Sequence, residues 1–512
     1  MDLDLNQLPP AYRAAFEAQQ AQIAALTEAK ARLEHLVAEF RQAIYGKKSE
    51  KLSPDERQLA FEDLEAAVAE VEAAKADATP AASHPRMDKV KRNLGRLPVE
   101  LPRIERVIEP ESIACPCGGD MVRIGEDRSE RLDIVPAQFR VIVTIRPKYA
   151  CRRCQEGVTQ APAAPHLIEG ALPTEGLIAH VLVSKYADHL PLYRQAQIFA
   201  RSGLALDRST LAGWVGKAAF HLAPVVDRLA EHLKRSTKLF MDETTAPILD
   251  PGRGRTKTGY LWALARDDRG WGGSDPPGVV YLYAPGRGGE HAERFLEGFS
   301  GTLQVDAYAG YNRLTREARP GGPLVVANCW AHARRKLREI YDRDSSPIAA
   351  EGLERIRKFY EIEREVRGRS AEERLVVRQA RTAPLVASFG VWLADVRSRI
   401  SAKSRLGEKL GYIARNWGGL QVFLADGRVE IDSNPVENTI RPLALGRKNA
   451  LFAGHDEGGR AWGRIASLIE TAKMNGVEPF AYLKTTLEAL ANGHPAFDID
   501  DLLPWAFNPT SS

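Results

Sequence analysis

The order of strand-like and helix-like runs from residue 238 to residue 341 limits the fold of this chain more than any other feature. Three strand-like runs come first, each close enough to the next for a hairpin: KLFMD, GYLWALAR and VVYLY. Helices expected at 290–299, 308–316 and 330–341 then alternate with the strand-like runs TLQVD and LVVANC. Hairpins give antiparallel neighbours, whereas strand–helix–strand connections give parallel ones. The order therefore predicts a mixed sheet.

Two of these strand-like runs end in an aspartate. Asp242 follows KLFM in the first strand, and Asp306 follows TLQV in the fourth. This strand order is that of a ribonuclease-H-like fold, in which the first and fourth strands are neighbours. Neighbouring strands would bring the two carboxylates side by side at one edge of the sheet, although they are 64 residues apart (306 − 242). We therefore expect an α/β ribonuclease-H-like catalytic core over residues 236–475.

A third acid, Glu437, lies in the segment SNPVENTIRPLALGRKNALF. Asn434 is expected to cap a helix there and Pro435 to occupy its first position, which seats Glu437 in the first turn. Pro442 is expected to kink or end this helix. The neighbouring acids Glu243 and Asp432 are expected to point away from the site.

The same segment carries three cations: Arg441, Arg447 and Lys448. Taken alone, one carboxylate among such cations is typical of a solvated surface cluster. Together with Asp242 and Asp306, however, Glu437 could converge on two hard divalent cations, Mg²⁺ or Mn²⁺. The three cations would then hold the phosphates of DNA near the metals.

Further helices are expected in the second half of the chain. Residues 345–426 are charged, helical in pattern and too long for a loop, which indicates a helical subdomain inserted into the core. A C-terminal helical region is expected over 476–512.

Four of the five cysteines form two close pairs, Cys115 with Cys117 and Cys151 with Cys154. Two cysteine knuckles around strands are typical of a zinc ribbon, which we expect over 111–160. The first knuckle is one residue shorter than the usual C-x₂-C, so four ordinary thiols remain the alternative.

The N-terminal third shows two further patterns. A heptad repeat over 16–44 predicts a coiled coil in a helical region that covers 1–75, or else one amphipathic helix packed on its own chain. Residues 76–110 form a basic linker, which would either follow a phosphate backbone or simply be solvated.

Residues 165–235 have the pattern of a helix-turn-helix domain. The sequence predicts helices at 193–200 and 209–219, the second capped by Ser209 and able to enter a major groove. In the alternative, Trp214 and Val215 belong to the core of a helical hairpin that reads no DNA.

The composition fits a multidomain protein without a membrane segment. A chain of 512 residues is too long for one core, and it has no apolar run of about eighteen residues and no signal-peptide pattern. We expect a cytoplasmic protein, associated with the nucleoid of a prokaryote. Its net charge of +4 indicates little by itself.

Several of these segments, in order along nearly the whole chain, resemble the large transposase subunit of the insertion sequence sixty-six family. They are FRQAIYGKKSEKL, the cysteine knuckles, YADHLPLYRQA, MDET, VDAYAGYN, CWAHARRKL, SNPVENTIRPLALGRKN and SLIETAKMNGVEPFAYL. The resemblance implies a DDE transposase that cuts at the ends of its element and joins them to target DNA. It assigns the catalytic, metal-binding roles to Asp242, Asp306 and Glu437.

The resemblance also implies zinc at Cys115, Cys117, Cys151 and Cys154. Cys329 and His332 match a C-x₂-H signature that follows the second aspartate in several DDE families. His332 would contact DNA or lie behind the metal ligands, or else it is a helix-capping or core histidine. The implied partners are the terminal inverted repeats, target DNA, further copies of the chain and small accessory proteins.

Two other classes of protein share part of this pattern. A ribonuclease-H-like nuclease or Holliday-junction resolvase would have the three acids without the modules that precede them. A non-catalytic DNA-binding protein descended from a transposase would keep those modules and lose an acid.

Overall fold

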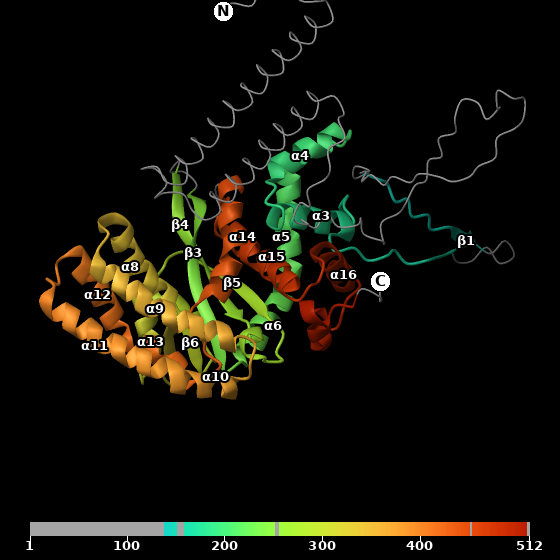
Figure 1. The fold of residues 1–512 in the computed structure, drawn as a ribbon. Coiled ribbons are helices and arrows are strands. Elements are labelled where there is room, and N and C mark those ends of the chain that lie inside the picture. The colour runs from blue at the N-terminus through green and yellow to red at the C-terminus, as the bar shows by residue number, and fades with distance from the viewer. Residues whose placement is uncertain (1–137, 151–157, 251–254, 451–452, 509–512) are drawn as a thin grey trace, which may run out of the picture. The chain divides into compact units, whose positions relative to one another are not determined.

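A five-stranded mixed sheet lies at the centre of the computed structural model, which describes residues 138–150, 158–250, 255–450 and 453–508. The strands are ordered β5–β4–β3–β6–β7 (Figure 1). Their bounds are β3 Lys238–Asp250, β4 Arg255–Arg266, β5 Gly278–Ala284, β6 Thr302–Val305 and β7 Val325–Asn328. β3, β4 and β5 pair antiparallel, whereas β6 pairs parallel with both β3 and β7. The prediction that the first and fourth strands are neighbours is confirmed.

Helices cover both faces of this sheet. Side chains alternate between the two faces along each strand, so each face carries residues that a helix can bury. Leu239 and Met241 pack into a core with the helices that precede the sheet, whereas Phe240 packs with Val436 and Leu443 of α14. The helices before the sheet are α3 Glu175–Tyr186, α4 Leu192–Arg201, α5 Arg208–His221 and α6 Ala223–Lys234. The later helices are α7 Gly289–Phe295, α14 Asn434–Ala450, α15 Asp456–Met474 and α16 Pro479–Ala491, of which α16 packs on α3 and α15 rather than on the sheet.

Helix α15 closes the outer edge of the sheet along β5. The Ser467 hydroxyl accepts a hydrogen bond from the Tyr281 N–H (2.8 Å), and the Thr471 hydroxyl accepts one from the Val279 N–H (3.0 Å). Gly463, one turn before Ser467, brings the helix so close that an added Cβ would lie 2.5 Å from the Tyr281 carbonyl oxygen. These contacts occupy backbone groups that an open sheet edge would expose to other chains.

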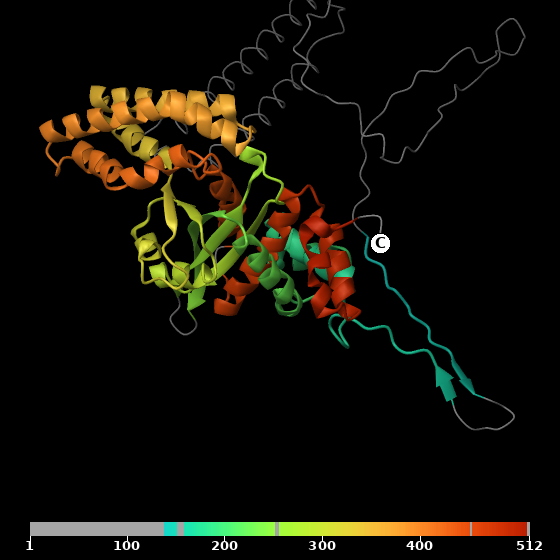
Figure 2. The same ribbon diagram turned by 90° about the horizontal axis from the view of Figure 1, so that it is seen from below.

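A helical insertion lies at the other edge of the sheet, beside β7 (Figures 1 and 2). Its helices pack around Trp330 in a core of their own. Deep within it, Arg378 forms a two-pronged ion pair with Glu363 (2.7 Å for both contacts). Its elements are α8 Trp330–Asp344, α9 Pro347–Val366, α10 Ala371–Val377, the π-helical turn η5 Arg378–Thr382, α11 Ala383–Arg399, α12 Arg405–Arg415 and α13 Trp417–Ala425.

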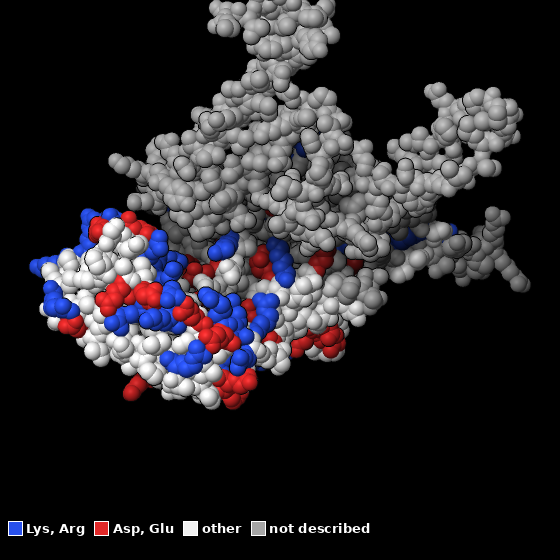
Figure 3. Space-filling view, in the orientation of Figure 1, with Lys and Arg blue, Asp and Glu red and all other residues white. Residues whose placement is uncertain are grey.

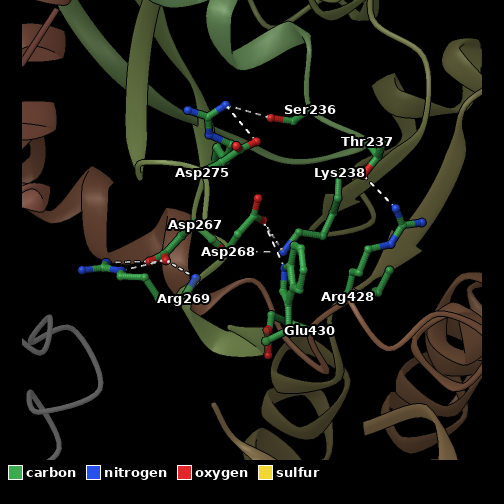
Figure 4. Close-up of polar contacts among 12 residues, drawn as sticks. Ser236, Thr237, Lys238, Asp267, Asp268, Arg269, Asp275, Arg428 and Glu430 are labelled. Atoms are coloured by element: carbon green, nitrogen blue, oxygen red, sulfur yellow. Dashed lines mark hydrogen bonds and ion pairs between the residues drawn. The ribbon is translucent and has the colours of Figure 1, made fainter. Parts of the chain in front are cut away.

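Charged side chains at the start of β3 connect the sheet to the segment that returns from the insertion (Figure 4). Lys238 is almost fully buried, and its amino group lies 3.5 Å from an Asp268 carboxylate oxygen. From the returning segment, the Arg428 guanidinium donates a hydrogen bond to the Thr237 hydroxyl (2.9 Å). These contacts anchor the chain before it enters α14.

Short elements complete the described residues. They are β1 Lys148–Ala150, β2 Val158–Gln160 and the 3₁₀ helices η3 Arg269–Trp271, η4 Ala309–Thr315, η6 Ala496–Leu502 and η7 Pro504–Ala506. None of the described helices has the length and apolar character needed to cross a membrane. The coiled coil, the basic linker and the four paired cysteines lie outside the described residues.

Two local predictions about helix ends were wrong. Pro442 does not end its helix: α14 continues to Ala450, held on the sheet by Leu443 and by the Tyr281 hydroxyl, which donates to the Thr439 carbonyl (2.5 Å). Packing on the sheet therefore outweighs the hydrogen bond that proline removes.

The other error concerns the cap of the second helix in the predicted helix-turn-helix. Asp207, not Ser209, caps α5, because its carboxylate accepts the Ser209 N–H (2.7 Å). The helix expected over 308–316 is present as the 3₁₀ helix η4.

Candidate active site

Asp242 lies on β3, and Asp306 directly follows β6, the parallel neighbour of β3. The paired residues of β3 and β6 run from Lys238 opposite Thr302 to Phe240 opposite Gln304, a constant offset of 64 (302 − 238). The same offset joins Asp242 to Asp306. Because Phe240 faces α14, Asp242 two residues later faces α14 as well.

The Asp242 carboxylate is in an environment that disfavours its charge. Burial, together with the nearby charge of Asp306, raises the pKa of Asp242 to about 8, and the charges of Glu243 and Glu437 contribute in the same direction. One backbone donor opposes them, since the Glu243 N–H lies 2.8 Å from Asp242 Oδ1. Burial and a neighbouring like charge both disfavour the charged form of a carboxylate, and a bound cation would favour it.

A strained turn fixes the Asp306 carboxylate. Ala307, which follows it, has a φ of +70°, a conformation that non-glycine residues rarely adopt. The turn allows the Tyr308 N–H to donate to Asp306 Oδ1 (2.8 Å), and the Tyr412 hydroxyl donates to the Asp306 carbonyl (2.9 Å). Backbone strain of this kind is common at functional sites.

Glu437 reaches the same region from the first turn of α14. The helix begins at Asn434, and the Ser433 carbonyl accepts the Glu437 N–H (3.2 Å), so the cap lies one residue before the predicted Asn434. The Ser433 hydroxyl donates to Glu437 Oε1 (3.2 Å). Arg335 Nη2 of α8 lies 3.6 Å from Glu437 Oε2. Sequence analysis missed Arg335, although it follows His332 by one helical turn.

His332 faces Glu437 from the first turn of α8. Its Nδ1 atom is buried, has no hydrogen-bond partner among the described residues and lies 3.7 Å from Glu437 Oε1. Burial lowers the pKa of His332, which favours the neutral imidazole. The structure therefore places His332 beside the third acid; its contact with DNA stays a prediction.

Cys329 lies immediately before α8. Its sulfur, a nitrogen of His332 and an oxygen of Glu437 all lie within 4.8 Å of one another. Burial raises the pKa of Cys329 to about 11, and its sulfur accepts the Ser433 N–H (3.2 Å). Cys329 is therefore a neutral thiol that supports the start of α14.

The three predicted phosphate-binding cations occupy different surroundings. Arg447 Nη1 donates to the Thr244 hydroxyl (2.8 Å) and to the Thr245 carbonyl (2.5 Å), contacts that fasten α14 to β3. Arg441 and Lys448 are exposed on the same helix. The structure thus gives Arg447 an internal contact, and the role of all three in DNA binding stays a prediction.

The two neighbouring acids are engaged elsewhere. Asp432 accepts hydrogen bonds from the backbone N–H (3.2 Å) and the side-chain amide (2.9 Å) of Asn434 at the start of α14. Glu243 lies on the opposite face of β3 from Asp242, where its side chain contacts Arg287 and Tyr311.

The outer face of the insertion is not a uniformly basic track. Figure 3 shows Lys and Arg interspersed there with Asp and Glu. Many form pairs along one helix, such as Arg355 with Glu351 in α9 (2.9 Å). Such pairs are typical of solvated helices.

The sequence matches known protein families over most of its length. Residues 170–461, more than half of the chain, match the family described as "Transposase IS66 family". The chain belongs to the IS66 transposase family. Its C-terminal residues 467–505 match the "IS66 C-terminal element".

Two further matches cover the N-terminal part. Residues 112–155, which include all four paired cysteines, match the "zinc-finger binding domain of transposase IS66". Residues 32–106 match "Transposase C of IS166 homeodomain", over the end of the predicted coiled coil and the basic linker. The IS66 architecture is thus multidomain, and DNA is the partner that it implies.

Full-length relatives occur in Sinorhizobium fredii. The protein y4jD is 45% identical over 92% of this chain and 93% of its own length. The protein y4qI is 43% identical over 94% of this chain and 89% of its own length. Both are named as uncharacterized proteins, so the transposase function rests on membership of the IS66 family.

Proposed function

We propose that this IS66 protein is a DDE transposase, in which Asp242, Asp306 and Glu437 hold two divalent cations and catalyse DNA cleavage and strand transfer. The observation that supports the proposal is the parallel pairing of β3 and β6, whose offset of 64 residues, continued two residues past the last pair, would bring Asp306 opposite Asp242. The sheet order, with three antiparallel strands followed by two parallel ones, supports a ribonuclease-H-like core.

The donor set fits hard divalent cations. Three carboxylates offer oxygen atoms only, the ligands that Mg²⁺ and Mn²⁺ prefer. The raised pKa of Asp242 agrees, because positive charge at the site would relieve the repulsion that Asp306 and Glu437 exert on it. When bound, two such cations would activate the attacking oxygen and stabilise the leaving oxygen.

The protein residues would contribute mainly position and charge. The Tyr308 N–H and the Ser433 hydroxyl orient the carboxylates of Asp306 and Glu437 before substrate arrives. Water would attack the phosphorus at the 3′ end of the element and release a 3′-hydroxyl. That hydroxyl would then attack a phosphodiester of the target, with no covalent bond between protein and DNA.

A zinc-bound finger at Cys115, Cys117, Cys151 and Cys154 would complete the protein. Together with the helix-turn-helix region, it would bind the terminal inverted repeats. In α5 of that region, Trp214 and Val215 are buried, so only the opposite face of the helix is available to DNA.

Cleavage of a labelled duplex that carries the terminal inverted repeats, with Mg²⁺ and the element's accessory proteins, tests the proposal. Asp242→Asn, Asp306→Asn and Glu437→Gln should each abolish cleavage and leave end binding almost intact, because amides keep the shape but lose the charge that holds the metal. Asp342→Asn, which alters an exposed acid of α8, serves as the control. Wild-type cleavage by Glu437→Gln would show that the third carboxylate lies elsewhere.

A further inference from the structure

We infer that Arg287 binds a phosphate of the DNA beside Asp306, and that Glu243 is the positioning residue that holds Arg287 there. The inference rests on the proposed function. Arg287 lies in the loop between β5 and α7, and Glu243 lies on β3 next to Asp242. Neither residue is one of the three proposed metal ligands, Asp242, Asp306 and Glu437.

Glu243 is a buried anchor. Its side chain is 1% exposed, and its Oε1 atom lies 2.6 Å from both Nε and Nη2 of Arg287. Its second oxygen accepts the Tyr311 hydroxyl (2.7 Å), so both oxygens of the carboxylate are engaged. Holding a carboxylate in a buried position costs free energy unless it is paired, and here the pairing fixes one edge of the guanidinium.

Tyr308 supplies the second anchor and links Arg287 to the acids. The guanidinium of Arg287 lies over the Tyr308 ring, 3.9 Å from its centre, and the Tyr308 hydroxyl donates to the Arg287 carbonyl (2.8 Å). The N–H of the same tyrosine orients Asp306. One residue therefore sets the positions of both the arginine and the second acid.

The helix that follows the Arg287 loop packs closely on the helix that follows Asp306. A Cβ added to Gly289, the first residue of α7, would lie 2.4 Å from the Gly310 carbonyl oxygen in η4. This contact holds the end of the loop against η4.

The outer edge of the guanidinium remains available to a ligand. An arginine has five N–H donors in one plane, and Glu243 engages those of Nε and one side of Nη2. The Arg287 side chain is 44% exposed, and the described residues give its Nη1 atom no hydrogen-bond partner. A planar donor edge of this kind suits a phosphate.

The charge balance indicates what this contact would do. Because Glu243 neutralises Arg287 in the free protein, the pair adds little net attraction for DNA. Its contribution would be donors fixed in place, which favour the charge that develops on the phosphate during cleavage. We therefore expect a larger effect on the rate of cleavage than on affinity.

Single-turnover cleavage of the terminal-repeat duplex, at saturating protein, tests this inference. Arg287→Ala should lower the rate on the order of tenfold to a hundredfold, with little change in end affinity. Arg287→Lys should also be slow, because an ammonium cannot contact Glu243 and a phosphate in one plane. Added guanidinium ion should partly restore Arg287→Ala.

Glu243→Gln should slow cleavage, and the double variant with Arg287→Ala should be no slower than Arg287→Ala alone, because Glu243 acts through Arg287. Arg313→Ala is the matched control, since Arg313 is similarly exposed (42%) and pairs with Glu293 (2.9 Å) in the same region. It should cleave at the wild-type rate.

Wild-type cleavage by Arg287→Ala, in an assay in which Asp242→Asn is inactive, would overturn this inference and leave the proposed function standing. Additive defects in the double variant would overturn the positioning role of Glu243. No cleavage by the wild-type protein would overturn the proposed function, and the inference with it.

Discussion

Asp306 directly follows β6, the parallel neighbour of the strand that carries Asp242, and its charge is the main cause, after burial, of the raised pKa of Asp242. Cations that bind there would remove a repulsion already present in the free protein. The free protein should therefore show a cost for holding these acids together.

That cost should appear as a pH dependence of stability in magnesium-free buffer. Between the ordinary pKa of 3.8 and the raised value of about 8, folded Asp242 holds a proton that the unfolded chain has lost. The free energy of unfolding should then fall as pH rises through this window, by up to about 1.4 kcal/mol per pH unit. Asp242→Asn should remove this fall, which urea unfolding at pH 5 and pH 8 would measure. An unchanged pH dependence in the variant would contradict the assignment.

Breaking the buried ion pair of the insertion should lower the free energy of unfolding strongly. Glu363→Ala would leave Arg378, which is fully buried, without its charge partner, and should cost about 3–5 kcal/mol in the free energy of unfolding. Glu365→Ala is the control, because its pair with Arg381 is half exposed and should contribute little to stability. Equal shifts of the urea midpoint in the two variants would argue against a buried network.

The closed sheet edge predicts a strong dependence on Gly463. In Gly463→Ala the new methyl group would press on the Tyr281 carbonyl of β5, and should destabilise the protein by about 1–3 kcal/mol. Gly216→Ala in α5 meets no atom within 4 Å and should stabilise by up to about 1 kcal/mol. Thermal unfolding of the two variants compares them directly.

The zinc-finger match predicts about one zinc ion per chain in the purified protein. Cys151→Ser should lower the zinc content measured by atomic absorption, whereas Cys329→Ser should not, because Cys329 lies next to α8 and outside the finger. A wild-type protein without zinc would show that the short first knuckle has lost the metal.

Sequence alone predicted a mixed sheet, because hairpin spacing and the alternation of strands with helices can be read directly along the chain. The ribonuclease-H-like order then predicted that its first and fourth strands are neighbours. Sequence analysis assigned no functional role to Glu243, because alternation along β3 shows only that the Glu243 side chain lies on the opposite face from Asp242. Its contact with Arg287 spans 44 residues and involves a glycine-rich loop without periodicity. Such a contact depends on tertiary packing. Arg447 illustrates the same limit, because the threonines that it contacts lie more than 200 residues away.

Rules that depend only on neighbouring residues succeeded at some helix ends and failed at others. The capping and proline rules placed the start of α14 to within one residue, but failed at Pro442, where packing against the sheet outweighs local preference. Ser209 was predicted as the cap of α5 instead of Asp207, because both residue types are preferred at helix N-caps and the two lie only two residues apart.

The number of divalent ions held by the three acids tests the central claim most directly. Electron paramagnetic resonance with Mn²⁺, on the complex with terminal-repeat DNA, should count two ions bound per active site in the wild-type protein. Asp242→Asn should lose at least one of them while still binding DNA. An unchanged count in Asp242→Asn, Asp306→Asn and Glu437→Gln would contradict the assignment of these acids as metal ligands.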